Sequence, residues 1–233
     1  MLSLIIPAFD EEDRLPATLT RVREYLDRAG ESYEVIVVDD GSVDATVETA
    51  EMVARSWPEL QVMRLAANTG KGAAVRLGML AARGSHRAFS DADLSTPMEE
   101  LPRLRAHLGG RCQVAIGSRA IAESRIEVHQ PAHRELMGRA YNRMLQLVAL
   151  PGISDSQCGF KVFTDVAATT CFEALRSPRF GFDAEVLLCA RRHCWEIAEV
   201  PVRWRHVEAS RVRSLRDSSH MLYDLARLRI KRR

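Results

Sequence analysis

The chain has 233 residues, of which 46% are hydrophobic and 27% charged, and its formal net charge at pH 7 is +2. These values fit an ordinary folded α/β protein, and they exclude a membrane-spanning chain because the longest apolar runs, such as residues 2–8, are far shorter than the roughly 20 residues that a spanning helix needs. No basic segment precedes the first apolar run and the five cysteines include no C-x-x-C pair, so we expect no secretory signal, reduced core thiols and a cytosolic protein.

Strands and helices alternate over the first half of the chain. Apolar runs rich in β-branched residues predict buried strands at 2–8, 33–42, 60–66, 86–93 and 112–119. Apolar residues at helical spacing predict helices between them, at 12–29, 43–57, 70–82 and 98–108. This alternation predicts right-handed βαβ units and a mostly parallel, Rossmann-like sheet with helices on both faces.

The pattern changes after residue 120. A polar stretch precedes an expected helix at about 133–149, a strand at 155–163, two further helices and a basic tail. The sequence contains no internal repeat and no low-complexity linker. We therefore expect a single domain, 1–233, built from a first half, 1–119, and a second half, 120–233.

Polar clusters follow each of the five predicted strands of the first half. They read PAFDEE, DDGSVD, NTGKG, DAD and GSR. The carboxyl ends of parallel strands share one edge of a sheet, where open α/β sheets bind their ligands. One shared cleft therefore explains these five clusters better than five unrelated turns.

Asp91 and Asp93 end the fourth predicted strand, in the stretch SDADLSTP. Two like charges this close repel each other in a partly dehydrated setting. Carboxylates at positions i and i+2 suit one hard cation, Mg²⁺ or Mn²⁺, which would cancel the repulsion and in turn bind a pyrophosphate. The alternative is a solvated Asx turn that caps the helix beginning at Met98.

Asp39 and Asp40 end the second predicted strand, ahead of a glycine that permits a sharp turn. One of the two acids could accept hydrogen bonds from a base N–H or a ribose hydroxyl, while the other orders the turn. The motif DDGS is weak alone because receiver domains also carry paired aspartates. Theirs follow a first strand, however, and this pair follows the second.

The stretch NTGKGAAVRLG sets two glycines and Lys71 at the start of a helix, where free N–H groups and the helix dipole favour an anion. It is not a Walker A loop, and the chain has no G-x-G-x-x-G. Both absences argue against an ATPase and a dinucleotide-dependent oxidoreductase. Lys71 is expected to face either a phosphate or the surface.

Arginines form a further group of candidates. From Arg203 onward the chain has ten Arg and Lys against three Asp and Glu, so this part carries +7 and the rest −5. Such a tail suggests a partner with phosphate, such as anionic lipid or a phosphorylated substrate, or else a solvated helix face. Nucleic acid is not expected, because no aromatic residues interleave with the tail's arginines. The guanidinium groups suited to bidentate phosphate contact are Arg119, Arg134, Arg139, Arg205 and Arg211.

Eight stretches, in this order, resemble the motifs of glycosyltransferase family 2. They are IIPAFDEEDRL, YEVIVVDDGSVDAT, NTGKGAAVRLGMLAARG, SDADLSTP, AIGSR, DSQCGFKVF, FGFDAEVLL and EVPVRW. Within the family they resemble the polyprenyl-phosphate (dolichyl-phosphate) hexosyltransferases, and the β-glucosyl branch more closely than the mannosyl branch. The resemblance implies a GT-A fold, a nucleoside-diphosphate sugar donor, UDP-glucose, and a lipid-phosphate acceptor.

The resemblance also implies roles for individual residues, with donor binding in the first half of the chain and acceptor binding in the second. The nucleotide sugar would contact Pro7, Ala8, Phe9, Glu11, Asp39, Asp40, Lys71, Asp91, Ala92 and Asp93, with Arg205 and Arg211 closing on the leaving diphosphate. The metal, Mg²⁺ or Mn²⁺, would bind Asp91 and Asp93. The acceptor phosphate would bind Arg119, Arg134 and Arg139. The expected catalytic residues are Asp93, Arg119 and Asp155.

The expected reaction is an inverting transfer in which an acceptor phosphate oxygen attacks the anomeric carbon of the sugar. A phosphate is already anionic near pH 7, so it needs positioning more than it needs a general base. One alternative is transfer to a soluble hydroxyl acceptor, with Asp155 or Asp183 as the base. Others are mannosyl transfer from GDP-mannose and a catalytically silent module that binds nucleotide sugars or an anionic membrane.

Two positions depart from the family's motifs. Asp10 stands where many members have asparagine, and Ser95 stands where mannosyl members often have a metal-binding glutamine, which disfavours mannosyl transfer. The chain also lacks the membrane-spanning helices that many members carry. We therefore expect it to act peripherally on the cytoplasmic face of a membrane, docked by its basic tail and helices or by a membrane-anchoring partner.

Overall fold

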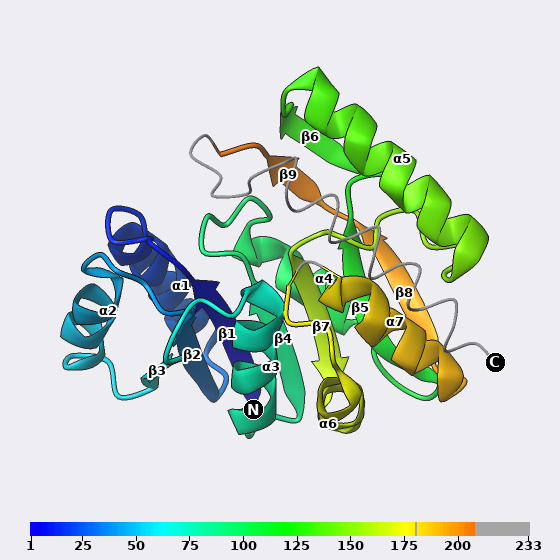
Figure 1. The fold of residues 1–233 in the computed structure, drawn as a ribbon. Coiled ribbons are helices and arrows are strands. Elements are labelled where there is room, and N and C mark those ends of the chain that lie inside the picture. The colour runs from blue at the N-terminus through cyan, green and yellow to red at the C-terminus, as the bar shows by residue number, and fades with distance from the viewer. Residues whose placement is uncertain (180, 208–233) are drawn as a thin grey trace.

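A computed structural model describes residues 1–179 and 181–207 of the chain (Figure 1). In this part, one seven-stranded sheet has the order β3-β2-β1-β4-β7-β5-β8, and β6 and β9 form a two-stranded sheet. The strands are β1 (Leu2–Ala8), β2 (Tyr33–Asp39), β3 (Leu60–Arg64), β4 (His86–Ser90), β5 (Cys112–Ser118), β6 (Arg125–Val128), β7 (Phe160–Thr164), β8 (Glu196–Pro201) and β9 (Arg203–Arg205). The helices are α1 (Leu15–Ala29), α2 (Thr46–Ala54), α3 (Lys71–Ala81), a 3-10 turn η1 (Met98–Glu100), α4 (Leu101–Arg105), α5 (Ala132–Val148), α6 (Asp165–Ala174) and α7 (Phe182–Arg192).

Alternate residues of the central strands pack into two apolar layers, one on each face of the sheet. On one face Ile5 and Val38 pack with side chains of α3, α6 and α7, the helices that lie in front of the sheet in Figure 1. On the other face Leu4 and Ile6 pack with side chains of α1, α2 and α4. A strand with apolar side chains on both faces is buried on both, as the continuous apolar runs predicted.

Strand direction sets which loops meet. β1 pairs parallel with β2 and with β4, and β2 pairs parallel with β3. β7 is antiparallel to both of its neighbours, β4 and β5, so β5 runs in the same direction as β4. The carboxyl ends of β1 to β5 therefore lie along one edge of the sheet, as the sequence predicted. Because β7 is reversed, the turn that precedes it reaches the same edge.

The structure differs from the predicted elements in three places. The expected strand at 155–163 begins only at Phe160, because residues 155–159 form the turn ahead of it. The expected helix at 98–108 is a 3-10 turn followed by the short α4, which has a proline in its first turn. β6, β8 and β9 were not predicted, since β6 is mostly exposed and β8 is only half-buried, so neither has the apolar run of a core strand.

The cysteines are all free, as expected, but they are not all core residues. Cys158, Cys171 and Cys189 are buried, Cys112 is half-buried and Cys194 is exposed. Cys194 has a positive φ of 57° just after α7, a conformation found at turns that leave a helix. None of the helices in residues 1–179 and 181–207 combines the length and the hydropathy that a bilayer-spanning helix needs.

Candidate active site

Asp91 lies at the centre of the polar edge of the sheet. It follows β4 directly, and its Oδ1 is 2.5 Å from the Nζ of Lys71, the first residue of α3. Its main-chain N–H donates to the carbonyl oxygen of Gly159 (3.2 Å), in the turn ahead of β7. About a third of the Asp91 side chain stays exposed, 36%, so the carboxylate can meet a ligand from solvent.

Asp93 is more enclosed than Asp91. Its Oδ1 accepts a hydrogen bond from the main-chain N–H of Ser95 (2.8 Å), and its Oδ2 is 3.9 Å from a guanidinium nitrogen of Arg14. Burial raises the pKa of Asp93 above its usual value, and the negative charge of Asp91 raises it further. The protein's own cations therefore do not fully compensate this carboxylate pair.

A divalent cation fits this pair chemically. Two repelling carboxylates at the end of a strand are hard oxygen donors, the ligands that Mg²⁺ and Mn²⁺ prefer. Among residues 1–179 and 181–207, no group of three or more His, Cys, Asp or Glu could hold a metal ion. A cation on Asp91 and Asp93 would thus keep several coordination positions for phosphate oxygens and water.

Lys71 faces the carboxylates, which is neither of the two orientations expected for it. Burial lowers the pKa of its ammonium group, but Asp91 and Asp183 outweigh burial and the pKa is raised. The Nζ also lies 5.9 Å from the centroids of the Phe89 and Phe182 rings. Lys71 is therefore a fixed positive charge beside the Asp91 carboxylate.

The anion at the start of α3 is the protein's own Asp40. Its carboxylate accepts hydrogen bonds from the main-chain N–H groups of Thr69 (2.8 Å) and Gly70 (2.8 Å). The N–H of Ala73, one turn into the helix, donates to the carbonyl oxygen of Pro178 (2.9 Å). Asp40 thus joins the end of β2 to α3, and the helix start predicted to receive a phosphate is already occupied by this side chain.

Asp39 orders the turn after β2. Its buried carboxylate accepts hydrogen bonds from the N–H of Gly41 (3.1 Å) and from both the N–H and the hydroxyl of Ser42, and it is 3.4 Å from Nε of Arg64. Both acids of the DDGS motif therefore bind other groups of the protein, whereas the sequence predicted that one of them could bind a base or a ribose. A contact between Asp39 and a nucleoside stays a prediction.

The loop after β1 is tied to the loop after β2. Pro7 and Ala8 are the last residues of β1, and the Ala8 carbonyl accepts a hydrogen bond from the N–H of Asp40 (2.8 Å). The N–H of Glu11 donates to the hydroxyl of Thr46 (2.7 Å), and the Glu11 carboxylate pairs with Arg14. Asp10, at a positive φ of 53°, accepts from the N–H of Val43 with its Oδ1, which an asparagine oxygen would do equally well. The other predicted donor contacts here, Phe9 and Ala92, are half-buried and buried respectively.

Arg119 and Asp155 form a bidentate ion pair at the end of β5. The guanidinium donates from Nε to Oδ2 (2.6 Å) and from a terminal nitrogen to Oδ1 (2.8 Å) of Asp155, and the main-chain N–H of Arg119 also donates to Oδ2 (3.0 Å). The Arg119 guanidinium lies 5.5 Å from the ring centroid of Trp204. The sequence predicted both residues as catalytic, but it did not predict that they bind each other.

Asp155 is held ionised by this contact. Burial would raise its pKa, but the positive charge and hydrogen bonds of Arg119 outweigh burial and hold the pKa at about 2. A carboxylate with so low a pKa accepts a proton poorly near neutral pH. Asp155 is therefore suited to fixing the Arg119 guanidinium and poorly suited to acting as a general base.

The ion pair predicts a specific acid dependence of stability. Since folding lowers the pKa of Asp155 from 3.8 to about 2, the pair contributes stability that is fully present above pH 4 and lost as pH falls toward 2. The difference corresponds to about 2 kcal/mol. We expect the unfolding free energies of wild type and Asp155→Asn, measured in urea, to differ at pH 7 and to converge between pH 4 and pH 2. A constant difference over that range would contradict this assignment.

A second buried pair, Lys161 and Asp183, lies beneath the site. Lys161 Nζ contacts the Asp183 carboxylate and donates to the carbonyl oxygen of Cys158 (2.8 Å), and it lies 5.1 Å from the Phe89 ring centroid. Burial raises the pKa of Asp183, against the opposing effect of Lys161 and Lys71. Lys161 was not among the residues predicted from the sequence. The feature that could have indicated it is a single lysine within the apolar run FKVF, because such a run predicts a strand that is buried on both faces.

The remaining predicted arginines do not all join these clusters. The main-chain N–H of Arg205, in β9, donates to the Ser95 carbonyl (3.0 Å), two residues from Asp93. Arg139 pairs with Glu135 on the exposed side of α5, and Arg134 lies half-buried at the start of that helix. Arg211 and the rest of the basic tail from residue 208 lie outside the described residues.

Gly159 connects the carboxylate pair with the turn that carries Asp155. A Cβ atom at residue 159 would overlap the Asp91 carboxylate, although the backbone there has no positive φ that would itself require glycine. We expect Gly159→Ala to move the Asp91 carboxylate and to lower activity by about 10²-fold, the scale of a 1 Å misplacement at a catalytic group. Steady-state kinetics and thermal unfolding together check this. A fully active variant would show that Asp91 does not need its observed position.

The sequence model of the family described as Glycosyl transferase family 2 matches residues 3–169. A dolichyl-phosphate beta-glucosyltransferase of Drosophila melanogaster is 38% identical over 224 residues, covering 91% of this chain and 69% of its own length. A dolichyl-phosphate beta-glucosyltransferase of Homo sapiens is 34% identical with the same coverage, and that of Saccharomyces cerevisiae is 29% identical over 247 residues, covering 98% of this chain and 74% of its own.

Solved structures share the fold at lower sequence identity. Glucosyl-3-phosphoglycerate synthase of Mycobacterium tuberculosis superposes with a TM-score of 0.71 at 21% identity, covering 100% of this chain and 80% of its own. The same synthase in complex with Mn²⁺, UDP-glucose and phosphoglyceric acid has a TM-score of 0.69, covering 98% and 79%. A mannosyltransferase of Pyrobaculum calidifontis in complex with GDP-mannose and Mn²⁺ has a TM-score of 0.61 at 16% identity, covering 90% and 57%.

Proposed function

Because the chain belongs to glycosyl transferase family 2, we propose that it transfers glucose from UDP-glucose to the phosphate of a polyprenyl lipid such as dolichyl phosphate. The chain is a glycosyltransferase with the GT-A fold. The observation that carries the proposal is that a carboxylate pair and an arginine fixed by a buried aspartate lie at the same edge of the sheet. The first suits a metal-bound donor diphosphate, and the second suits an acceptor phosphate.

The donor side of the site consists of Asp91, Asp93 and Lys71. The two carboxylates would hold Mg²⁺ or Mn²⁺, whose positive charge would stabilise the negative charge of the departing diphosphate. Two GT-A relatives with solved structures contain Mn²⁺ together with a nucleotide sugar. Lys71 fixes Asp91 from the side of α3. The expected nucleoside contacts lie in the loops after β1 and β2, and Arg205 and Arg211 are expected at the diphosphate.

The acceptor side consists of Arg119, with Arg134 and Arg139 as further expected phosphate contacts. Asp155 occupies one edge of the Arg119 guanidinium through Nε and one terminal nitrogen. Guanidinium has five N–H donors, so the other terminal nitrogen can bind a phosphate oxygen. Arg119 would therefore hold the acceptor phosphate in a fixed direction relative to the sugar.

The proposed reaction is a single displacement with inversion. An anionic oxygen of the acceptor phosphate attacks the anomeric carbon of glucose, a new C–O bond forms, and the bond from that carbon to UDP breaks with the electron pair leaving on UDP. No proton needs to be removed from the attacking group, since a lipid phosphate is ionised at neutral pH. The residues then act by orientation and by charge stabilisation.

Transfer to a hydroxyl acceptor fits the site less well. Such a reaction needs a general base, and the candidates from the sequence were Asp155 and Asp183. Asp155 has a pKa of about 2 and both of its oxygens bind Arg119, while Asp183 is engaged by the buried Lys161. Mannosyl transfer is disfavoured by Ser95, whose side chain is short and buried, where mannosyl relatives were expected to carry a metal-binding glutamine.

The acceptor of the proposed reaction is confined to a bilayer, so the enzyme has to work at a membrane surface. We propose that it binds peripherally at the cytoplasmic face, through anionic lipid or a membrane-anchoring partner. In this proposal the first half of the chain, 1–119, serves the donor, and the second half, 120–233, serves the acceptor.

The assay that tests the proposed function uses UDP-[¹⁴C]glucose, a short polyprenyl phosphate in detergent micelles, and Mn²⁺ or Mg²⁺. We expect label in the organic phase and release of one UDP per glucose, with loss of both when the metal is chelated by EDTA. Matched reactions with GDP-mannose and with soluble glycans serve as controls. Label that stays in the aqueous phase, or faster transfer from GDP-mannose, would contradict the proposal.

A further inference from the structure

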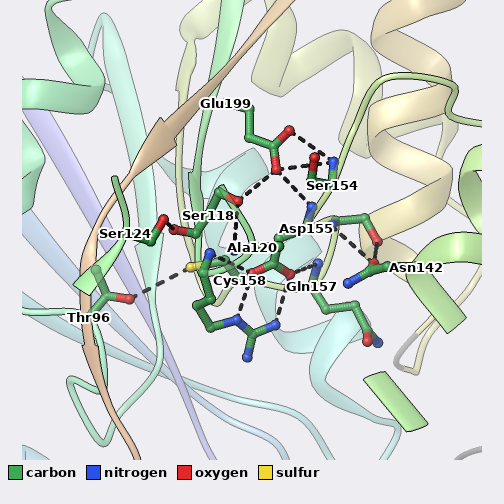
Figure 2. Close-up of polar contacts among 12 residues, drawn as sticks. Thr96, Ser118, Ala120, Ser124, Asn142, Ser154, Asp155, Gln157, Cys158 and Glu199 are labelled. Atoms are coloured by element: carbon green, nitrogen blue, oxygen red, sulfur yellow. Dashed lines mark hydrogen bonds and ion pairs between the residues drawn. The ribbon is translucent and has the colours of Figure 1, made fainter. Parts of the chain in front are cut away.

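Glu199 binds both chain segments that carry the Arg119–Asp155 ion pair. It lies on β8, the outermost strand of the seven-stranded sheet, which pairs with β5. Its Oε1 accepts hydrogen bonds from the hydroxyl of Ser118 (2.7 Å), the residue before Arg119, and from the main-chain N–H of Asp155 (2.8 Å). Its Oε2 accepts from the main-chain N–H of Ser154 (2.9 Å). Figure 2 shows Glu199 between Ser118 and the segment of Ser154 and Asp155.

These contacts hold the main chain beside each of the two members of the ion pair. Two successive N–H groups that point at one carboxylate hold the chain at residues 154–155 in a single conformation. The Ser118 hydroxyl, held by the same carboxylate, in turn accepts from the N–H of Ala120 (3.2 Å). The main chain on both sides of Arg119 is therefore fixed relative to the main chain of Asp155.

We propose that Glu199 is a positioning residue that sets the direction of the Arg119 guanidinium through Ser118 and the 154–155 turn. Its significance for catalysis rests on the proposed function, in which Arg119 holds the acceptor phosphate. Glu199 does not reach the substrate itself. It determines where the phosphate-binding edge of Arg119 points, because Arg119 has no freedom to turn once Asp155 is fixed.

Glu199 stabilises the 154–155 turn by hydrogen bonds to its charged carboxylate, and not by apolar packing. Hydrogen bonds from main-chain N–H groups to a carboxylate are charge-assisted and stronger than neutral ones. A glutamine at residue 199 keeps the size of the side chain but has one neutral acceptor oxygen in place of two charged ones, so the Ser118 hydroxyl and the N–H groups of residues 154 and 155 share that oxygen and their hydrogen bonds weaken. The 154–155 turn then gains freedom while the apolar layers of the fold stay unchanged.

The chain contains a matched control. Glu34 lies near the amino end of β2, on the side of the sheet away from the carboxyl ends of the strands. It accepts hydrogen bonds from the hydroxyl of Ser3 (2.6 Å) and from the main-chain N–H of Arg83 (2.6 Å). The carboxylate is buried and, like Glu199, accepts from a serine hydroxyl and a main-chain N–H, and it also forms an ion pair with the guanidinium of Arg83 (3.0 Å). Its partners Ser3 and Arg83 do not belong to the Arg119 site. Glu34→Gln therefore reports what the loss of such a carboxylate costs the fold in general.

The first measurement is independent of any substrate. In ¹⁵N-labelled protein, the Nε–H signal of Arg119 is assigned by its absence from Arg119→Lys, and its exchange with water is measured. We expect exchange to be about tenfold faster in Glu199→Gln, the equivalent of one weakened charge-assisted hydrogen bond, and unchanged in Glu34→Gln. Equal exchange in wild type and Glu199→Gln would overturn the proposal. If Glu199→Gln does not fold, the same comparison with Glu199→Asp decides it, since the shorter carboxylate cannot reach all three donors.

The second measurement is kinetic. We expect Glu199→Gln to lower kcat/KM for polyprenyl phosphate by about 10²-fold while the Kd of UDP with Mn²⁺ changes little. In an Arg119→Lys background the same substitution should add almost nothing, since Glu199 acts through Arg119. Additive losses in the double variant would overturn the proposal. A wild-type enzyme inactive on polyprenyl phosphate would refute the proposed function alone, because the exchange of the Arg119 signal still decides the role of Glu199.

Discussion

Asp91→Asn and Asp93→Asn are each expected to lower kcat/KM for sugar transfer on the order of 10³-fold, the equivalent of several kcal/mol of lost charge stabilisation at the leaving diphosphate. Each substitution removes one of the two carboxylates that would hold the metal. The Kd of UDP measured with Mn²⁺ should rise in both variants, and the Kd measured without metal should change little. Calorimetric titration of UDP with and without Mn²⁺ checks this.

The stability of the Asp93 variant should move in the opposite direction from its activity. Folding raises the pKa of Asp93, through burial and the charge of Asp91, so its ionised form is a cost to the folded state at neutral pH. Asp93→Asn removes that cost, and we expect an unchanged or higher Tm. Asp165→Asn, at an exposed aspartate in the first turn of α6, is the control: it should leave activity unchanged and lower Tm only slightly, because it removes one favourable charge at a helix N-terminus. An active Asp93→Asn enzyme would refute the metal assignment.

Arg119→Ala is the second substitution with a large expected effect, and it should affect both acceptor use and stability. Without the guanidinium, the Asp155 carboxylate stays buried, with 2% of its side chain exposed, and loses its bidentate counter-ion, while the main-chain N–H groups of residues 119 and 157 still donate to it. Breaking a buried ion pair from one side costs about 3 kcal/mol or more. Losing the phosphate contact should lower kcat/KM for the acceptor by about 10²-fold.

A comparison with other variants separates these two effects. Arg119→Lys keeps a positive charge near Asp155 but loses the bidentate geometry, so acceptor kinetics should suffer more than stability. Arg111→Ala removes an arginine that is 75% exposed and 3.5 Å from Glu196, and it should change stability by less than about 1 kcal/mol. Urea unfolding and acceptor kinetics on all three variants test this. Normal acceptor kinetics in Arg119→Ala would exclude Arg119 from the phosphate site.

The donor side of the site was largely predictable from the sequence. Parallel strands place their carboxyl ends at one edge, and the clusters after β1 to β5 do lie there. The pair Asp91 and Asp93 could be identified because the acids, the strand and their spacing are all local features. Local features do not reveal which residues these side chains contact. Asp40 binds the start of α3, and Lys71 binds Asp91, and in both cases the two partners are far apart in the sequence.

The Arg119–Asp155 pair could not have been predicted as a pair. The two residues are separated by 36 positions, and they meet only because β7 enters the sheet in the reverse direction between β4 and β5. A short apolar run predicts a buried strand but not its direction or its neighbours. Glu199 was missed for a related reason: β8 is a half-buried edge strand without a clear pattern, so its single inward carboxylate resembled a surface residue.

The reversed β7 has a consequence for the order in which the chain can fold. Both neighbours of β5, the strands β7 and β8, come from the second half of the chain, and β4 also lacks one neighbour until β7 is made. A nascent chain that ends at residue 119 would therefore hold β5 with no partner strand and β4 with an open edge, which favours aggregation. The donor half and the acceptor half thus differ in the ligand that each is proposed to bind, but they are not separate folding units. The sheet is complete only when the strands of both halves are present.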